Sequence, residues 1–304
     1  MRSSAKDEVL ARLRQHIARV EGGAAGRSIT ITPAGSAPAA AGEAAAASPH
    51  EIERTGDPAS AAVRLGAAEI DRRLPGGGLQ RGRLHEVIGA IEGAGTGFAV
   101  HVLRRLLAGD AAGADGGPVL WCAPRCSLHA PGLAARGLNV DRLVVVTAPR
   151  REDRLWAMEE SLRVSGVLAV VGELQGRETV DLTASRRLQL AAGQGGGLAL
   201  LLRPPPPGTR PVAVEETDDG GGAEAGPVPG ASAAVTRWHV QTVAAADGSR
   251  GGDLGLRSRW RLALVRSRTG ARHCWIVEVD HATGDLAVAS PLRDRSGTAR
   301  RAAG

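Results

Sequence analysis

Residues 85–98, HEVIGAIEGAGTGF, run from the end of an apolar strand into a glycine-rich loop and then into a helix. The helix is indicated by apolar residues at helical spacing on one side, namely Phe98, Val102, Leu103, Leu106 and Leu107. A strand, a glycine loop and a helix in this order build the phosphate-binding loop of many nucleotide-binding proteins. The stretch therefore predicts an α/β fold with such a loop after an early core strand.

The loop lacks the residue that normally completes a phosphate site. It opens with Gly89 and closes with Gly95, Thr96 and Gly97. Five residues separate Gly89 from Gly95, where the usual motif has four. Threonine stands at the lysine position and glycine at the hydroxyl position, and Lys6 is the only lysine in the chain. Losing that charge-assisted contact costs about 1.5–3 kcal/mol of ligand binding. We expect a loop retained for the fold, with ATP hydrolysis lost or much reduced.

An acidic residue follows the apolar strand within VLAVVGEL, residues 167–174. In phosphate-loop enzymes the acid at such a strand end positions Mg²⁺, and here Glu173 has that place. The alternative is a charged side chain that ends a strand beside a loop, and the missing lysine favours this second interpretation. No cofactor is the first expectation, with ATP and Mg²⁺ as the secondary candidates.

Short strands and helices alternate along the chain. The predicted strands are 84–88, 119–123, 143–147, 167–171 and 198–202, and the predicted helices are 97–108, 128–136, 153–164 and 183–192. Asp153 is the expected cap of the third helix, and Thr183 or Ser185 that of the fourth. Strands that are apolar throughout indicate a parallel sheet with both faces covered. The later predicted strands, 234–243, 259–265, 273–280 and 286–289, follow one another without helices. The pattern predicts a three-layer α/β core with a mostly parallel sheet and an antiparallel, β-rich C-terminal end.

Composition divides the chain into segments. Residues 1–21 suit an amphipathic helix, which either packs on its own core or docks on a neighbouring subunit, mediating self-association, or on a partner. Residues 22–60, rich in Ala, Gly, Ser and Pro, are expected to form a flexible linker. Residues 61–292 form the expected core domain, with an acidic, proline-rich disordered insertion at 204–230. Residues 293–304 form a basic tail.

Charge and cysteine content indicate a compartment and a class of partner. The net charge of +6 and the sequence pI of about 10.6 are compatible with nucleic acid or another acidic partner. The three cysteines give no disulfide framework, which indicates a reducing compartment. The N-terminus has no apolar stretch of signal-peptide length, and no run of about 18 apolar residues could span a membrane. We expect a cytoplasmic protein.

Two groups of arginines are candidate binding residues. Residues 250–273 hold seven arginines and one acid, and this basic stretch is either a DNA-binding strand or a solvated face. The candidate DNA contacts are Arg257, Arg259, Arg261, Arg266 and Arg268. Arg186 and Arg187 lie near a helix start in DLTASRRLQLAA. They bind a partner, contact DNA phosphate or pair with an internal carboxylate such as Glu173 or Asp181.

The cysteines do not predict a metal site. Cys122, Cys126 and His129 have a loosely metal-like spacing. A zinc site usually needs a second pair of ligands, which Cys274 alone does not supply.

The stretch VRLGAAEIDRRLPGGGLQRGRLHEVIG, residues 63–89, resembles the approach to the phosphate loop in RecA-type recombinases. The matching residues are Ile70, Asp71, Leu74, Gly76, Gly77, Gly78, Leu79, Gly82 and Arg83. On this alignment the 204–230 insertion falls where RecA has its second DNA-binding loop. The RecA catalytic glutamate falls near Pro124, and the sensor strand ends in Leu202 and Arg203. The resemblance implies a RecA-like domain whose ATPase parts are eroded.

These departures fit one family, the ImuA proteins, which this chain resembles over residues 63–243. The motifs that carry the resemblance are GGGL, HEV, VLW, the WAMEESL segment, GE, DLTASRRLQLAA and TRW. Their residues here are 76–79, 82, 85–87, 89, 119–121, 156, 159, 160, 162, 172, 173, 181–192 and 236–238.

The resemblance implies a non-catalytic accessory protein of SOS-induced translesion DNA synthesis and mutagenesis. Such proteins act with ImuB, a hub that resembles Y-family polymerases, and through it with an error-prone DNA polymerase. RecA and single-stranded DNA are further expected contacts, and a membrane is not. One alternative is a DNA-stimulated ATPase, whose magnesium-dependent turnover would be lost on changing Thr96 or Glu173. The other is a SulA-like regulator of RecA or cell division, which would co-purify without a polymerase partner.

Overall fold

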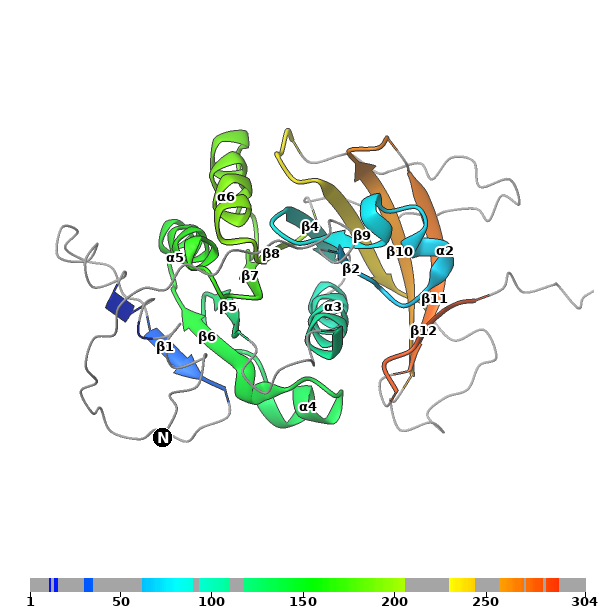
Figure 1. Ribbon diagram of the computed structural model, residues 1–304, viewed down its shortest axis with the longest axis horizontal. Helices are drawn as coiled ribbons and strands as arrows, with labels where there is room; N and C mark the ends of the chain where they lie inside the picture. Colours follow the sequence, from blue (N-terminus) through cyan, green and yellow to red (C-terminus); the bar gives the residue numbers. More distant parts are fainter. Residues whose placement is uncertain are drawn as a thin grey trace, which may run out of the picture.

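The computed structural model describes residues 11, 14–15, 30–34, 62–89, 93–109, 117–205, 230–243, 257–270, 272–280 and 283–289. These residues form a mixed ten-stranded sheet in the order β1-β6-β5-β7-β8-β4-β9-β10-β11-β12, with helices on both faces (Figure 1). A separate two-stranded ribbon pairs β2 with β3. The α/β class with an antiparallel C-terminal end is confirmed.

The strands of the large sheet lie close to their predicted positions. They are β1 (Thr30–Pro33), β4 (Leu84–Gly89), β5 (Val119–Ala123), β6 (Leu143–Thr147), β7 (Ala169–Glu173), β8 (Leu198–Arg203), β9 (Thr236–Thr242), β10 (Arg257–Ser267), β11 (His273–Asp280) and β12 (Leu286–Val288). The ribbon strands are β2 (Ala62–Val63) and β3 (Leu79–Gln80). The helices are α2 (Ala68–Asp71), α3 (Ala94–Gly109), α4 (Ala130–Ala135), α5 (Arg151–Arg163) and α6 (Leu182–Gly195), with 3₁₀ turns at Pro75–Gly77 and Val140–Arg142.

The strands β6, β5, β7, β8, β4 and β9 are parallel to one another, and the remaining pairs are antiparallel. Every residue of β5 and β8 is buried, as expected for parallel strands covered on both faces. Figure 1 shows α5 and α6 on one side of the sheet and α3 and α4 on the other. Phe98 of α3 and Leu133 of α4 belong to one apolar core, and Met158 of α5 and Leu188 of α6 belong to the second.

All four helices predicted from the sequence begin at a residue other than the predicted one, and α4 begins at Ala130 in place of residue 128. Helix α3 begins at Ala94, inside the glycine loop, and Gly97 N donates to Gly93 O at 2.8 Å. Helix α5 begins at Arg151 with Arg150 as its N-cap, so the predicted cap Asp153 is wrong. Helix α6 begins at Leu182, because the Asp181 carboxylate accepts from Ala184 N at 2.7 Å and so caps it in place of Thr183 or Ser185.

The predicted linker contains a strand. Residues Thr30–Pro33 form β1 and pair antiparallel with β6 at the edge of the sheet. Ile31 packs against the core formed with α5 and α6. The composition of this segment has no sustained period and so favours a linker, whereas its pairing depends on a sheet edge more than a hundred residues later.

The tryptophans of the C-terminal strands face the core. Trp238, Trp260 and Trp275 are 0%, 3% and 6% exposed and pack in the core that also holds Phe98. Phe98 lies between Trp238 and Trp260, with ring centroids 5.7 and 6.4 Å away. The antiparallel strands therefore complete the core on the α3 side of the sheet.

Several predicted segments lie outside the described residues. These are residues 293–304, residues 206–229 of the insertion, and residues 1–21 apart from Ala11, Arg14 and Gln15. Among the described residues, no helix combines the length and apolar character that crossing a bilayer requires.

Candidate functional site

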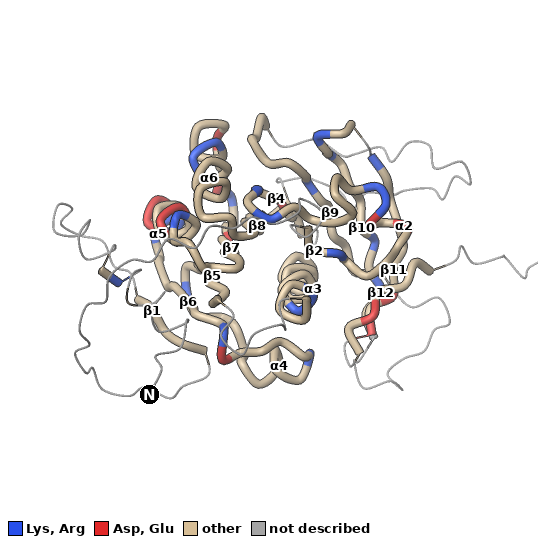
Figure 2. The backbone as a smooth tube through the Cα atoms, in the orientation of Figure 1, with Lys and Arg blue, Asp and Glu red and all other residues tan. Residues whose placement is uncertain are grey.

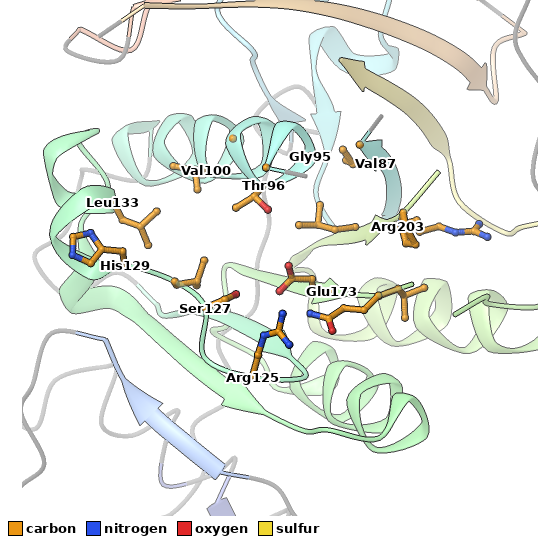
Figure 3. Close-up of a pocket in the computed structure, with 18 of the residues that line it drawn as sticks. Val87, Gly95, Thr96, Val100, Arg125, Ser127, His129, Leu133, Glu173 and Arg203 are labelled. Atoms are coloured by element: carbon orange, nitrogen blue, oxygen red, sulfur yellow. The ribbon is translucent and has the colours of Figure 1, made fainter. Parts of the chain in front are cut away.

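A cavity of about 710 Å³ lies between the start of α3 and the loops that follow β5, β7 and β8. All five residues predicted for a nucleotide site line it, namely Gly89, Gly95, Thr96, Gly97 and Glu173. They meet because the C-terminal ends of parallel strands share one edge of the sheet. In Figure 3, Thr96, Glu173 and Arg125 point into this space from three separate elements.

The start of α3 keeps one feature of a phosphate site and lacks two others. The first backbone N–H groups of a helix have no intrahelical partner and favour an anion. Thr96, at the lysine position, has a short neutral side chain. At Gly97, the hydroxyl position, a Cβ would come within 3.2 Å of the Trp260 ring. Packing against a buried tryptophan therefore accounts for the glycine where a metal-binding hydroxyl would stand.

Glu173 is held by protein groups. Trp121 Nε1 donates to its Oε2 at 3.4 Å. Burial raises the pKa of Glu173, against the opposing effects of the Trp121 hydrogen bond and the charges of Arg154 and Arg125. Burial therefore opposes the charged form of the carboxylate, which is the form that binds Mg²⁺. These contacts explain the position of the acid without a metal.

Three arginines that the sequence analysis did not assign to this site line the cavity. They are Arg125 after β5, Arg136 at the end of α4 and Arg203 at the end of β8. Arg203 already has a carboxylate partner, because its Nη1 donates to Glu86 Oε1 at 3.3 Å. For Arg125 and Arg203, the place at or just after a strand end at the carboxyl edge was the available signal, whereas Arg136 follows helix α4. Without a lysine or a metal-binding hydroxyl, these residues do not fit the Mg²⁺–ATP chemistry of a phosphate-loop enzyme.

Arg154, on α5, fixes the edge of the sheet from which Glu173 projects. Its guanidinium is 1% exposed and donates to the carbonyl oxygens of Ala148, Pro149 and Glu173 at 2.9, 2.7 and 3.0 Å. It also forms an ion pair with Glu178 in the loop after β7. The buried arginine thus joins the ends of β6 and β7, a role that the sequence pattern did not reveal because its acceptors are mostly backbone.

Comparison with known proteins identifies the family of this chain. No protein-family model matches the chain. Protein ImuA from Caulobacter vibrioides, in strains NA1000 / CB15N and ATCC 19089, is 34% identical over 247 residues. The match covers 79% of this chain and 93% of the relative. The chain belongs to the ImuA family. The crystal structure of the RadB recombinase has a TM-score of 0.50 and 15% identity, covering 75% of this chain and 100% of that one. This likeness confirms the RecA-like fold.

Two motifs of the ImuA resemblance, HEV and TRW, are neighbours in the sheet. Strands β4 and β9 pair His85 with Thr236, Glu86 with Arg237 and Val87 with Trp238. His85 Nε2 donates to the Gln80 carbonyl oxygen at 2.9 Å, so in the neutral ring Nδ1 accepts from the Thr236 hydroxyl at 2.7 Å. Trp238 Nε1 donates to the same hydroxyl oxygen at 2.9 Å. The two motifs form one hydrogen-bonded unit.

Glu86 is the centre of a buried ion cluster on the opposite face of β4. Its side chain is fully buried and accepts from Arg237 Nε at 2.6 Å, from Ser232 Oγ at 2.6 Å and from Arg203 Nη1 at 3.3 Å. Arg237 is 1% exposed and also donates to Gly230 O at 3.2 Å. The cluster joins β4, β8 and β9 to the loop before β9.

The stability of this ImuA-family protein should depend on pH through His85. Burial lowers the pKa of His85 to about 4, from its ordinary value of 6.5. The unfolded chain therefore binds more protons than the folded one between these values, and the free energy of unfolding falls as the pH falls through this window. Urea denaturation at pH 7 and pH 5 should show a loss about 2 kcal/mol larger for the wild type than for His85→Gln. Equal losses in the two proteins would contradict this assignment.

The other ImuA motifs meet where α5 and α6 cover the sheet. A Cβ at Gly172 of the GE motif would overlap Met158 Sδ of the WAMEESL segment. Glu159 of that segment pairs with Arg163 and with Arg187 of α6, both at 2.5 Å. For Arg187 the internal ion pair is therefore confirmed, with Glu159 as the carboxylate in place of Glu173 or Asp181. Arg186 is exposed on the outer face of α6.

The arginines predicted to bind DNA do not lie on one free face. Arg259 is 16% exposed and lies 3.6 Å from Glu278 of β11. Arg261 is half-buried, and Arg266 donates to Ser232 O at 2.6 Å. Arg268 is exposed in the turn after β10, and the side chain of Arg257 lies outside the described residues. DNA binding by this set stays a prediction.

The three cysteines have different surroundings. Cys122 is buried in β5, and burial raises the pKa of its thiol to about 12. Cys126 is exposed, and His129 caps α4 by accepting from Gly132 N at 3.1 Å. No group of three or more potential metal ligands gathers within the described part of the chain.

Proposed function

We propose that this protein is a non-catalytic accessory protein of damage-induced mutagenesis, which acts by binding an ImuB-type hub and, through it, an error-prone polymerase. Membership of the ImuA family and a RecA-like fold support the proposal. The observation that carries its non-catalytic part is the cavity at the start of α3. It holds every predicted residue of the nucleotide site, yet Thr96 and Gly97 stand where a lysine and a hydroxyl are needed.

Nucleotide turnover should be absent. Calorimetric titration of the purified chain with ATP and Mg²⁺ should give no binding heat at millimolar nucleotide, and phosphate release should stay at background with or without single-stranded DNA. The reason is the missing lysine, which in phosphate-loop enzymes contacts the β and γ phosphates. Micromolar binding with turnover that Glu173→Gln abolishes would replace the proposal with the ATPase alternative. Turnover that Glu173→Gln leaves unchanged would indicate a contaminating ATPase.

The outer face of α6 is the proposed contact for ImuB. Leu190 is 68% exposed, and it is the one large apolar side chain that is exposed among the residues the structure describes. Arg186 lies one turn before it on the same face. Arginine is enriched among the residues that contribute most to binding at interfaces, and Leu190 adds exposed apolar area beside Arg186. Arg187 pairs with Glu159 of α5 and so holds α6 against α5 beside this contact.

Co-purification with ImuB tests this contact. Arg186→Glu combined with Leu190→Asp should abolish recovery of tagged ImuB, because it reverses the charge and removes the apolar anchor. The matched control is Arg72→Glu combined with Ala68→Asp, at exposed positions at the two ends of α2, away from the cavity. The control should recover ImuB like the wild type. Full recovery by the α6 variant would exclude α6 as the contact, and no recovery by the wild type would exclude ImuB binding itself.

A further inference from the structure

Four exposed arginines lie at the end of the sheet where the parallel strands begin, which is opposite to the cavity. Arg83 precedes β4, Arg268 and Arg272 lie in the turn between β10 and β11, and Arg73 follows α2. The pKa of His273, at the start of β11, is lowered by burial and, to a smaller extent, by the charge of Arg73. Arg73 therefore lies near the start of β11, at this same end of the sheet. We call these four residues the arginine edge.

Backbone hydrogen bonds fix the order of the arginine edge. Val235 N donates to Leu84 O at 2.8 Å, and Arg268 N donates to Val235 O at 3.1 Å. Leu84, next to Arg83, and Arg268 are therefore separated by two strand spacings, or about 10 Å. Strand β11, which follows the turn with Arg272, lies one strand farther on. The cations form a row across β4, β9, β10 and β11.

The arginine edge has no ion-pair partner among the residues that the structure describes. The guanidinium groups of Arg73, Arg83, Arg268 and Arg272 make no hydrogen bond or ion pair with another described residue. The acids near Arg73 in sequence are Glu69 and Asp71, and Asp71 already accepts from Leu65 N and Gly66 N. The opposite edge is mixed in sign, because Glu173, Glu178 and Asp181 lie there among its arginines. Figure 2 shows basic residues around β4, and both basic and acidic residues around α2 and on α5.

We propose that the arginine edge binds the phosphodiester backbone of DNA without regard to sequence. A row of cations that have no ion-pair partner among the described residues releases counterions from phosphates and needs no apolar anchor. An acidic protein partner would also need apolar contacts. The large apolar side chain that is exposed among the described residues is Leu190, which lies on α6 and not at the arginine edge. Base stacking is not part of the contact, because Trp238, Trp260 and Trp275 are buried. This inference rests on the proposed role beside a DNA polymerase and differs from the predicted strand site, sharing Arg268 with it.

Fluorescence anisotropy with a labelled oligothymidylate tests the arginine edge in the full chain. Arg268→Ala combined with Arg272→Ala should weaken binding about tenfold and lower the slope of log affinity against log salt by about 1.4. Arg83→Ala should weaken binding in the same direction. The matched control, Arg150→Ala combined with Arg177→Ala, removes the same charge from exposed positions at the opposite edge and should change affinity by less than about twofold.

Four results would overturn the inference: no binding by the wild type, unchanged binding by the Arg268/Arg272 variant, equal weakening by the control pair, or displacement of the DNA by a polyglutamate peptide at an equal concentration of charge. Recovery of tagged ImuB by the Arg268/Arg272 variant separates this inference from the proposed function. Normal ImuB recovery with weakened DNA binding supports both. DNA binding of unchanged strength in that variant overturns the arginine edge and leaves the ImuB assignment in place.

Discussion

Replacing Glu86 with alanine should lower the free energy of unfolding by about 3–5 kcal/mol, because it leaves buried guanidinium groups without their carboxylate. Glu86 is fully buried, and Arg237, its closest charged partner at 2.6 Å, is 1% exposed. Removing one partner of a buried pair costs more than the pair contributed, since the remaining charge keeps its desolvation penalty. Such a loss is a large part of the total stability of a domain, about 5–15 kcal/mol.

Urea denaturation of Glu86→Ala beside Glu278→Ala measures this effect. Glu278 also faces an arginine, Arg259 at 3.6 Å, but its side chain is 53% exposed and its loss should cost less than about 1 kcal/mol. Glu86→Gln keeps the shape of the side chain and should fall between the two. If Glu86→Ala fails to fold, the Gln variant still gives a value. Losses below about 1 kcal/mol for both Glu86 variants would show that the cluster does not hold β4, β8 and β9 together.

Gly195→Ala should destabilise the protein by about 3 kcal/mol or more. A Cβ at Gly195 would overlap the backbone carbonyl oxygen of Leu162, at the point where the end of α6 crosses α5. A backbone atom cannot rotate away as a side chain can, so the two helices would have to separate. Their separation would also loosen the pairing of Arg187 with Glu159.

Gly193→Ala is the matched control on the same helix. The atom closest to a Cβ at Gly193 is Gly82 O, at 3.9 Å, which is an ordinary contact. Alanine there should leave the stability unchanged or raise it by about 0.5–1 kcal/mol, because glycine is less favourable than alanine inside a helix. Thermal and urea unfolding of the two variants should therefore move in opposite directions. Equal effects would show that α5 and α6 adjust to each other freely.

The same two contacts bear on the proposed function. The Glu86 cluster contains Arg203, which also lines the cavity, so the cation that could have faced a phosphate is held by an internal acid. Gly195 sets how closely α6 packs on α5, and α6 carries the exposed pair Arg186 and Leu190. Variants of Glu86 and Gly195 are expected to weaken partner binding by destabilising the fold. The surface variants at Arg186 and Leu190 are expected to weaken partner binding without changing stability.

The sequence predicted elements whose signal is local. The apolar runs at 119–123 and 143–147 match β5 and β6 residue for residue, because a strand buried on both faces is apolar throughout. The ends of α3, α5 and α6 were less well predicted. Their first turns contain glycine, charged or polar residues that carry no helical period, and only the backbone and cap hydrogen bonds define them.

By itself, the sequence determined the α/β class, the absence of the phosphate-loop lysine and the family, because periodicity, motif spacing and residue identity lie along the chain. Tertiary structure decided which charges are free. Arg187 and Arg203 are engaged by Glu159 and Glu86, while Arg83 and Arg268 meet at an edge without a carboxylate partner among the described residues. Ion pairs form between side chains far apart in sequence, so the charge that remains for a partner depends on how the strands and helices are packed.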